Sequence, residues 1–301
     1  INRTRANILT ENMQKWGHHN VVITNDNAES FSNTKGFFDL IIIDAPCSGE
    51  GLFRKQPEAV QEWSAAHVEA CSKRQRKILQ DVWPALKQNG VLLYSTCTYN
   101  RAENEENLHW LSQQFDVEFL AITTQAHWGV QTVEENALKA YRFYPHRTQG
   151  EGFFMAAIRK NAPEETPPIK KSASLNQPST RVVDQLSAWI VHDQLKPMFF
   201  RWHDTVRIVP AHKTAAIEYI IKHIHILATG TAIAELKHEK LIPEHGLALS
   251  AALRTDNFPT INVSTDQALQ YLRRESIHVE SALKGYSLIM YHDMPLGWVN
   301  A

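Results

Sequence analysis

The chain has 301 residues, more than a single hydrophobic core usually spans, so its length favours two domains over one. A formal net charge of −1, with 43% hydrophobic and 21% charged residues, is ordinary for a globular protein and argues against a mainly disordered chain. The same charge excludes binding of a polyanion through overall basicity, so any contact with nucleic acid must come from local features.

The first half of the chain alternates apolar runs with helical patterns, which is typical of a largely parallel sheet covered by helices, the α/β class. We expect a helix that Ser64 caps and Asn89-Gly90 ends, with a kink at Pro84. Asn100 and Glu103 form a plausible capping pair for a following helix. The predicted strands are residues 21–24, 39–44, 91–95, 118–122 and 153–159.

Residues 161–180 are rich in Pro, Ser, Lys and Glu, and they predict a linker between a domain of residues 1–160 and a region of residues 181–301. The second region mixes helical and strand patterns, so we expect a smaller α+β fold there. Ser264 and Gln267 predict a capping box before a helix. The other predicted elements are a helix at 182–191, strands at 205–209, 224–227 and 260–263, and a hairpin of 286–291 with 296–299.

Two apolar strands of the first half each end in a cysteine among turn-forming residues. Residues 39–51, DLIIIDAPCSGEG, contain Asp44 and Cys47, and residues 90–100, GVLLYSTCTYN, contain Cys97. Ligand sites of open α/β sheets lie at the carboxyl ends of the strands, so neighbouring strands would bring these three residues into one crevice. A lone cysteine is more often a packed core residue, as we expect for Cys71, but the joint pattern favours function for the other two.

The two cysteine stretches resemble motifs of the Sun-type (Fmu-like) RNA cytosine-5 methyltransferases. The resemblance runs from about Arg3 to Lys160 and includes residues 54–55, 103–105, 142–146 and 152–154. It implies a Rossmann-like methyltransferase domain that uses S-adenosylmethionine. The family's glycine-rich cofactor turn is not found here, so we expect an N-terminally incomplete domain that binds the cofactor poorly by itself.

The resemblance implies a role for each matching residue. Cys97 would be the nucleophile that adds to the cytosine ring, and Cys47 would assist release of the product. Asp44 would contact the cofactor and the base, and Asp26 would meet the adenine, although a plain turn aspartate is the alternative for Asp26. We also expect a helix N-terminus after Cys97 to lower its pKa. Low-specificity candidates for RNA contact are Arg54, Lys55, Arg142 and His146, for which a solvated basic face is the commoner role.

The end of the chain supports a more specific expectation. Residues 295–299, PLGWV, resemble the accessory region of the RsmF-like ribosomal RNA branch, which includes a PUA-like RNA-binding module. The predicted function is therefore methyl transfer to C5 of a cytosine in RNA, with ribosomal RNA as the expected partner and a flipped or unpaired base as the target. Two alternatives stay open: a non-catalytic RNA-binding relative that has lost its cofactor loop, and, more weakly, a thiol hydrolase.

The remaining patterns predict what the protein lacks. The three cysteines are far apart without a zinc or disulfide spacing, and the fifteen histidines have no matching carboxylate or cysteine pattern, so no metal is expected. No apolar run reaches the ~20 residues that span a bilayer, which argues against a membrane partner. We expect reduced thiols and a cytoplasmic location, while the oligomeric state is left open.

Overall fold

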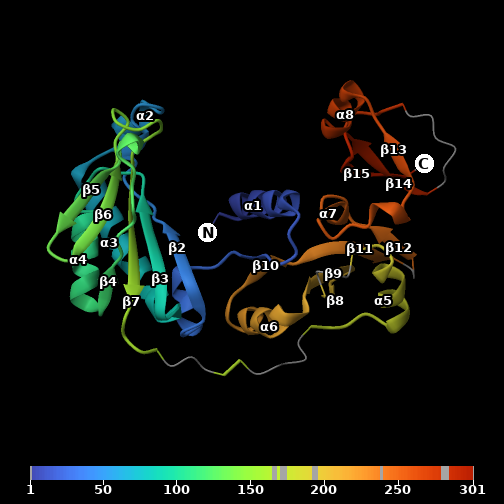
Figure 1. The fold of residues 1–301 in the computed structure, drawn as a ribbon, viewed down its shortest axis with the longest axis horizontal. Coiled ribbons are helices and arrows are strands. Elements are labelled where there is room, and N and C mark those ends of the chain that lie inside the picture. Colours follow the sequence, from blue (N-terminus) through green and yellow to red (C-terminus); the bar gives the residue numbers. More distant parts are fainter. Residues whose placement is uncertain are drawn as a thin grey trace. The chain divides into compact units, whose positions relative to one another are not determined.

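A computed structural model describes residues 2–164, 168–169, 175–191, 196–237, 240–278 and 285–300 (Figure 1). The chain forms two compact units, here called the first unit (Asn27–Pro168) and the second unit (Ile1–Asp26 with Ile169–Ala301). The division departs from the predicted one at the N-terminus. Residues 1–26 join the second unit because β1 (Val22–Thr24) pairs antiparallel with β10 (Ile226–Thr229).

The first unit is built on a mixed sheet in the order β2-β3-β7-β6-β5, with β4 also paired to β7. β2 and β3 are parallel, whereas β7 is antiparallel to β3, β4 and β6. The α/β class is confirmed, but a largely parallel sheet is wrong for the described residues of this unit. The strands are β2 (Phe38–Asp44), β3 (Leu86–Thr96), β4 (Val117–Phe119), β5 (Gln131–Glu135), β6 (Leu138–Phe143) and β7 (Phe153–Lys160).

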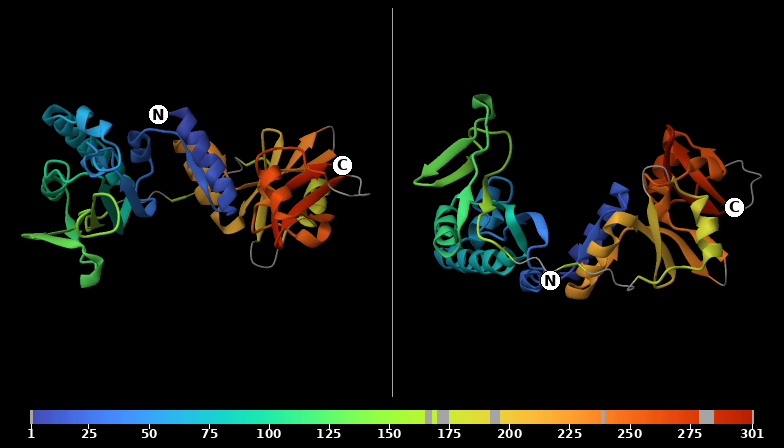
Figure 2. Two further views of the ribbon diagram at one scale, coloured as in Figure 1. Left: turned by 90° about the horizontal axis from the view of Figure 1, so that it is seen from above. Right: turned by 60° about the horizontal axis from the view of Figure 1, so that its bottom comes forward.

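Helices α3 (Ala65–Val82) and α4 (Glu105–Gln114) pack side by side against this sheet (Figures 1 and 2). The predicted cap of α3 is confirmed, since the Ser64 hydroxyl accepts from the His67 amide at 3.1 Å. The helix ends at Val82, before Pro84, and Asn89-Gly90 lie inside β3 and not at the helix end. A short helix, α2 (Glu58–Glu62), and 3-10 turns at Ala28–Asn33, Glu50–Leu52, Trp83–Ala85 and Ala126–Trp128 complete this unit.

The second unit combines a four-stranded antiparallel sheet, β12-β11-β9-β8, with a three-stranded sheet, β13-β14-β15. The predicted α+β character, the Ser264–Gln267 capping box and the terminal hairpin are confirmed. The strands are β8 (Pro197–Trp202), β9 (Thr205–Pro210), β11 (Thr231–Lys237), β12 (Lys240–Pro243), β13 (Thr260–Asn262), β14 (Tyr286–Tyr291) and β15 (Met294–Asn300). The helices are α1 (Arg3–Trp16), α5 (Thr180–Ser187), α6 (Thr214–His223), α7 (His245–Ala248) and α8 (Thr265–Leu272), with 3-10 turns at Ala211–Lys213 and Thr255–Asn257.

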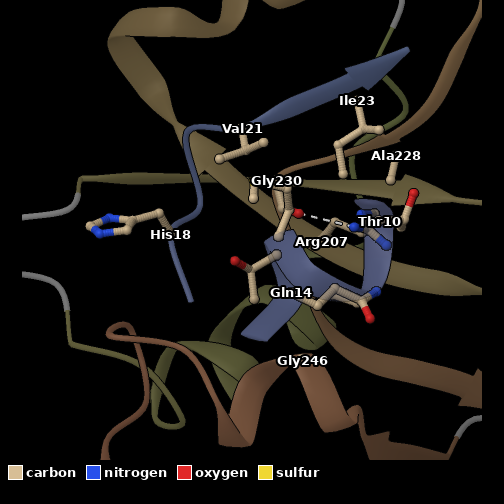
Figure 3. Close-up of a pocket in the computed structure, with 12 residues that line it drawn as sticks. Thr10, Gln14, His18, Val21, Ile23, Arg207, Ala228, Gly230 and Gly246 are labelled. Atoms are coloured by element: carbon tan, nitrogen blue, oxygen red, sulfur yellow. Dashed lines mark hydrogen bonds between the residues drawn. The ribbon is translucent and has the colours of Figure 1, made fainter. Parts of the chain in front are cut away.

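A small cavity in the second unit lies beside α1 (Figure 3). Its volume is about 20 Å³, which leaves room for roughly one water molecule. The guanidinium of Arg207 donates to the backbone oxygens of Thr229 at 2.7 Å and Gly230 at 2.9 Å. Thr10 and Gln14 of α1 also line the cavity, but no residue predicted to bind cofactor or RNA does. Because the cavity holds only about one water molecule, it is too small to be the site of a cofactor.

Candidate active site

Two loops meet at the carboxyl ends of β2 and β3: the first cysteine loop, residues 46–51, and the second cysteine loop, residues 97–100. The parallel register sets Asp44 opposite Ser95, and hydrogen bonds from the Ala45 amide to Ser95 and from the Gly51 amide to Cys97 continue the pairing, each at 2.9 Å. The Cys97 amide donates to the Cys47 sulfur at 3.2 Å. The structure thus places the two half-buried cysteines in direct contact.

The contact shifts the pKa values of the two thiols in opposite directions. The Cys47 thiol donates a hydrogen bond to the Cys97 sulfur, which lowers the pKa of Cys97 against the opposing effects of burial and of the nearby Asp44 charge. The same hydrogen bond, together with burial, raises the pKa of Cys47. The neighbouring thiol, and not the predicted helix N-terminus, is the main cause of the lowered pKa, and α4 begins only at Glu105. Cys97 is therefore the thiol of the pair that ionises more readily.

The buried carboxyl group of Glu103 holds the first cysteine loop through hydrogen bonds. Oε2 of Glu103 accepts from the Ser48 amide at 3.0 Å and from the Gln75 amide nitrogen at 2.8 Å. That same nitrogen of Gln75 donates to the Pro46 oxygen at 2.9 Å. The backbone is thus fixed on both sides of Cys47. The predicted capping pair of Asn100 and Glu103 is wrong, because Asn104 occupies the N-cap of α4 and the Glu103 side chain faces the loop.

A second carboxyl group joins the two loops. Oε2 of Glu50 accepts from the Thr98 hydroxyl at 2.9 Å and from the Tyr99 amide at 3.1 Å. Gly51 allows the close approach, since a Cβ there would lie 2.7 Å from the Cys97 oxygen and 2.5 Å from the Gly152 oxygen. The motif glycine is therefore required by backbone packing beside the cysteine pair.

Glu103→Gln is expected to change how the stability of the first unit depends on pH. Burial raises the pKa of Glu103 above its usual 4.5, and its Oε1 has no hydrogen-bond partner among the described residues. A raised folded-state pKa contributes stability at low pH that is lost as the pH rises above about 4.5 and through the folded pKa. The wild type should therefore lose stability relative to Glu103→Gln over that rise, as measured by urea unfolding across a pH series.

A comparison variant separates the charge from the hydrogen bonds. Gln75→Met removes one partner of the Glu103 carboxyl but keeps the carboxyl itself, so it should lower stability. It should keep a pH dependence that extends to higher pH, because the Gln75 hydrogen bond lowers the pKa of Glu103. If the stability of the wild type and of Glu103→Gln changed equally with pH, a group other than Glu103 would cause the pH dependence.

Arg142, expected to contact RNA, is instead buried in an ion pair. Its Nε and one terminal nitrogen donate to the two carboxyl oxygens of Glu105 at 2.7 and 2.6 Å, and the other terminal nitrogen donates to the Tyr99 oxygen at 2.8 Å. The side chains of Arg142 and Glu105 are 7% and 0% exposed. This pair holds the second cysteine loop against α4 and leaves little of the Arg142 side chain exposed to solvent.

The other RNA candidates are exposed. Arg54 donates to the Gly150 oxygen at 2.8 Å, and Lys55 and His146 lie on the surface of the same unit. The sequence interpretation missed the ring of Tyr144, which stacks on Tyr99 at 5.4 Å between centroids and lies 5.5 Å from the His146 ring. A row of three rings, Tyr99, Tyr144 and His146, therefore begins two residues after Cys97. In the sequence, the signal for this row was the aromatic residues within 90–100 and 142–146.

Asp44 ends β2 and lines a groove of about 380 Å³ whose walls are mostly apolar. β2 is the edge strand of the described sheet, so its side chains Leu40 and Ile42 are 49% and 66% exposed beside this groove. Asp26 belongs to the second unit, where its carboxyl accepts from the His225 amide at 3.0 Å. Within the first unit, the structure therefore places Asp44 close enough to the cysteine pair for its charge to act on Cys97.

The described residues contain neither a metal cluster nor a membrane-spanning helix. No group of three or more His, Cys, Asp or Glu side chains among them has a geometry that would hold a metal ion. Within the same part of the chain, no helix has the length and apolar character needed to cross a membrane.

The chain is similar to a set of ribosomal RNA methyltransferases. The family described as 16S rRNA methyltransferase RsmB/F matches residues 1–159, and the methyltransferase RsmF PUA domain matches residues 258–301. Ribosomal RNA small subunit methyltransferase F from Photobacterium profundum is 30% identical over 313 residues, and that from an Enterobacter species is 29% identical over 303 residues. Each alignment covers 98% of this chain, which spans 64% and 62% of these relatives.

Among solved structures, NSun6 from Pyrococcus horikoshii with SFG is similar to part of the chain. The sequence identity is 27% and the TM-score is 0.45, over 54% of this chain and 40% of that protein.

Proposed function

Because the chain belongs to the RsmB/F family of 16S rRNA methyltransferases and ends in an RsmF-type PUA domain, we propose that it carries the catalytic cysteines of an RNA cytosine-5 methyltransferase. The reaction is transfer of a methyl group from S-adenosylmethionine to C5 of a cytosine in ribosomal RNA, and a cytoplasmic location follows from that substrate. The observation that carries the proposal is the contact between Cys47 and Cys97 at the ends of two parallel strands.

The thiol pair suits the first chemical step. C5 of cytosine is a weak nucleophile, and addition of a thiolate at C6 makes it enamine-like, so a difficult step is split into easier ones. Cys97 supplies this thiolate because the Cys47 hydrogen bond lowers its pKa. Asp44, which ends β2 beside the pair, is assigned to N3 and the exocyclic amine of the base. A proton held at N3 draws electrons from C6 and eases the attack.

S-adenosylmethionine, when bound, supplies an electrophilic methyl group carried on a positively charged sulfur. The groove next to Asp44 suits part of such a molecule in volume and in its apolar walls, and the Asp44 carboxyl at its rim complements the positive charge. We assign Asp44 to the cofactor as well as to the base. Asp26 keeps its assignment to the adenine, which rests on the family resemblance.

Release of the product uses the same pair. After methylation, a base takes the proton on C5, the electrons of that C–H bond re-form the double bond between C5 and C6, and the bond from C6 to the Cys97 sulfur breaks so that Cys97 leaves as a thiolate. The Cys47 thiol already donates a hydrogen bond to that sulfur, so it stabilises the leaving group as well as the nucleophile. This gives a physical basis for the release role of the first cysteine.

Cys47→Ala is therefore expected to slow release and to let a covalent adduct of protein and RNA accumulate. Loss of the Cys47 hydrogen bond should also move the pH profile of Cys97 alkylation by iodoacetamide to higher pH. The measurements are a denaturing gel for the adduct and mass spectrometry of alkylated peptides. An unchanged Cys97 profile, with normal turnover and no adduct, would exclude the role.

The RNA contacts are proposed for exposed groups. Arg54, Lys55 and His146 are assigned to phosphates or to the nucleotides around the target, with the Tyr144 ring as a stacking partner for a base. The PUA domain, residues 258–301, is assigned to the same RNA. A base inside a stacked duplex cannot reach Cys97, so the target cytosine must be unpaired or flipped.

The function is tested with a chimaera in which this chain replaces the matching segment of the Photobacterium profundum relative. Labelled methyl transfer to small-subunit ribosomal RNA, followed by nucleoside analysis, should show 5-methylcytosine. A folded chimaera that binds S-adenosylmethionine and RNA but transfers no methyl group would favour the alternative, a non-catalytic RNA-binding relative.

A further inference from the structure

The two cysteines that meet at the ends of β2 and β3 have the arrangement of a thiol pair that can be oxidised. Adjacent strands lie about 5 Å apart, within the range of Cα separations that a disulfide bridges. Hydrogen bonds continue the pairing past the strand ends on both sides of Cys47, and the Cys47 sulfur lies 3.2 Å from the Cys97 backbone nitrogen. The sulfur of one cysteine thus lies against the backbone of the other, and the paired loops hold the two side chains within reach of each other.

The surroundings favour redox chemistry over metal binding. The described residues offer no third ligand, since no cluster of three His, Cys, Asp or Glu side chains forms a metal geometry there. Both cysteines are only half-buried, which favours access by a small oxidant. The contact lowers the pKa of one thiol and raises that of its neighbour, which suits a reactive cysteine with a resolving partner beside it.

The third cysteine provides a contrast within the same unit. Cys71 is buried on α3, with its sulfur 3.6 Å from the His67 ring, and burial raises the pKa of its thiol. Within the described residues no hydrogen bond joins it to another cysteine, and the nearby Cys97 also raises the pKa of its thiol, so Cys71 should react slowly. Any fast loss of two thiols on oxidation is therefore assigned to the pair.

We propose that Cys47 and Cys97 form a modification site at which a peroxide closes a reversible intramolecular disulfide. The Cys97 thiolate attacks one peroxide oxygen, the O–O bond breaks, and the leaving hydroxide takes a proton to become water, which leaves Cys97 as a sulfenic acid. Cys47 then loses its proton and attacks the Cys97 sulfur, and the S–O bond breaks with release of a second water. The two thiols lose two electrons and two protons, and the peroxide is reduced to two waters.

The consequence for activity rests on the proposed function: the disulfide removes both the nucleophile and the thiol that assists release. It also protects Cys97 from irreversible oxidation, because the resolving attack by Cys47 competes with a second peroxide. A dithiol reductant restores both groups.

The test uses the 301-residue chain and hydrogen peroxide, with no RNA or cofactor, so its failure is distinct from failure of the methyl-transfer proposal. After treatment, free thiols are alkylated and peptides are mapped by mass spectrometry without reduction. We expect Cys47 and Cys97 to lose alkylation together, to appear in one linked peptide pair that lacks two hydrogens, and to return fully with dithiothreitol. Cys71 should stay alkylated.

Two variants complete the design. Cys71→Ser should behave as the wild type, whereas Cys47→Ser should convert Cys97 to sulfinic or sulfonic acid that dithiothreitol does not restore. The proposal is overturned if wild-type Cys97 gains oxygen without a link to Cys47, if it links to Cys71 or to a second chain, or if Cys47→Ser leaves Cys97 as recoverable as in the wild type.

Discussion

Cys97→Ser is expected to abolish methyl transfer in the chimaera, with a loss on the order of 10³-fold or more. A serine hydroxyl stays protonated at neutral pH and is a far poorer nucleophile than the thiolate that the Cys47 hydrogen bond favours. The Cys97 side chain makes no structural contact as specific as those of Glu103 or Glu50, so the fold should persist. Incorporation of labelled methyl groups into ribosomal RNA measures the effect.

A matched control is Cys71→Ser, which alters the cysteine on α3 that has no catalytic assignment. This variant should keep methyl transfer within a few-fold of the wild type. Undiminished transfer by Cys97→Ser would remove Cys97 from the role of nucleophile, whereas equal losses in both variants would indicate a general effect on the fold.

Arg142→Met is expected to destabilise the first unit by about 3–5 kcal/mol, because it leaves the Glu105 carboxylate buried without its partner. Arg142 also donates to the Tyr99 oxygen, so the second cysteine loop should loosen with it. Hydrogen exchange of peptides from β3 and β6 measures the free energy of opening of this unit.

An exposed ion pair on the same sheet shows how much of the expected loss comes from burial. Arg159→Met breaks an ion pair with Glu118 on the same sheet, but those side chains are 39% and 52% exposed, so the loss should stay below about 1 kcal/mol. Replacing both buried partners, Arg142→Met with Glu105→Leu, should recover most of the stability, since no charge is left unpaired. Equal effects of Arg142→Met and Arg159→Met would contradict the account of the buried pair.

The features that could be predicted are those with local causes. Unbroken apolar runs of β-branched residues and leucine predict β2 and β3, and the turn residues Pro46, Gly49 and Asn100 end them, so the position of each cysteine at a strand end followed from the sequence. Ser64 and Ser264 were recognised as helix caps because their partners lie three residues away. The neighbouring, parallel arrangement of the two strands was an inference from fold class, and the register confirms it.

The features that could not be predicted depend on partners distant in the chain. Glu103 fits a local capping pattern, but the Ser48 amide, 55 residues away, takes its carboxyl group. Arg142 is basic and lies in a motif, so it suggested RNA until the structure paired it with Glu105. The hairpin of β5 and β6 was missed because Thr132, Glu134 and their neighbours in β5 give no apolar alternation, and its turn needs Asn136 at a φ of 57°.

The central claim is that Cys97, activated by Cys47, forms the covalent bond to the target base. It is tested most directly by trapping the chimaera on RNA that carries 5-fluorocytosine at its methylation sites, since fluorine on C5 cannot leave as a proton does and the adduct cannot resolve. Mass spectrometry of the linked peptide should place the nucleotide on Cys97, with yield dependent on S-adenosylmethionine. A nucleotide attached to Cys47, or methyl transfer to ordinary RNA with no adduct on the fluorinated one, would contradict the account.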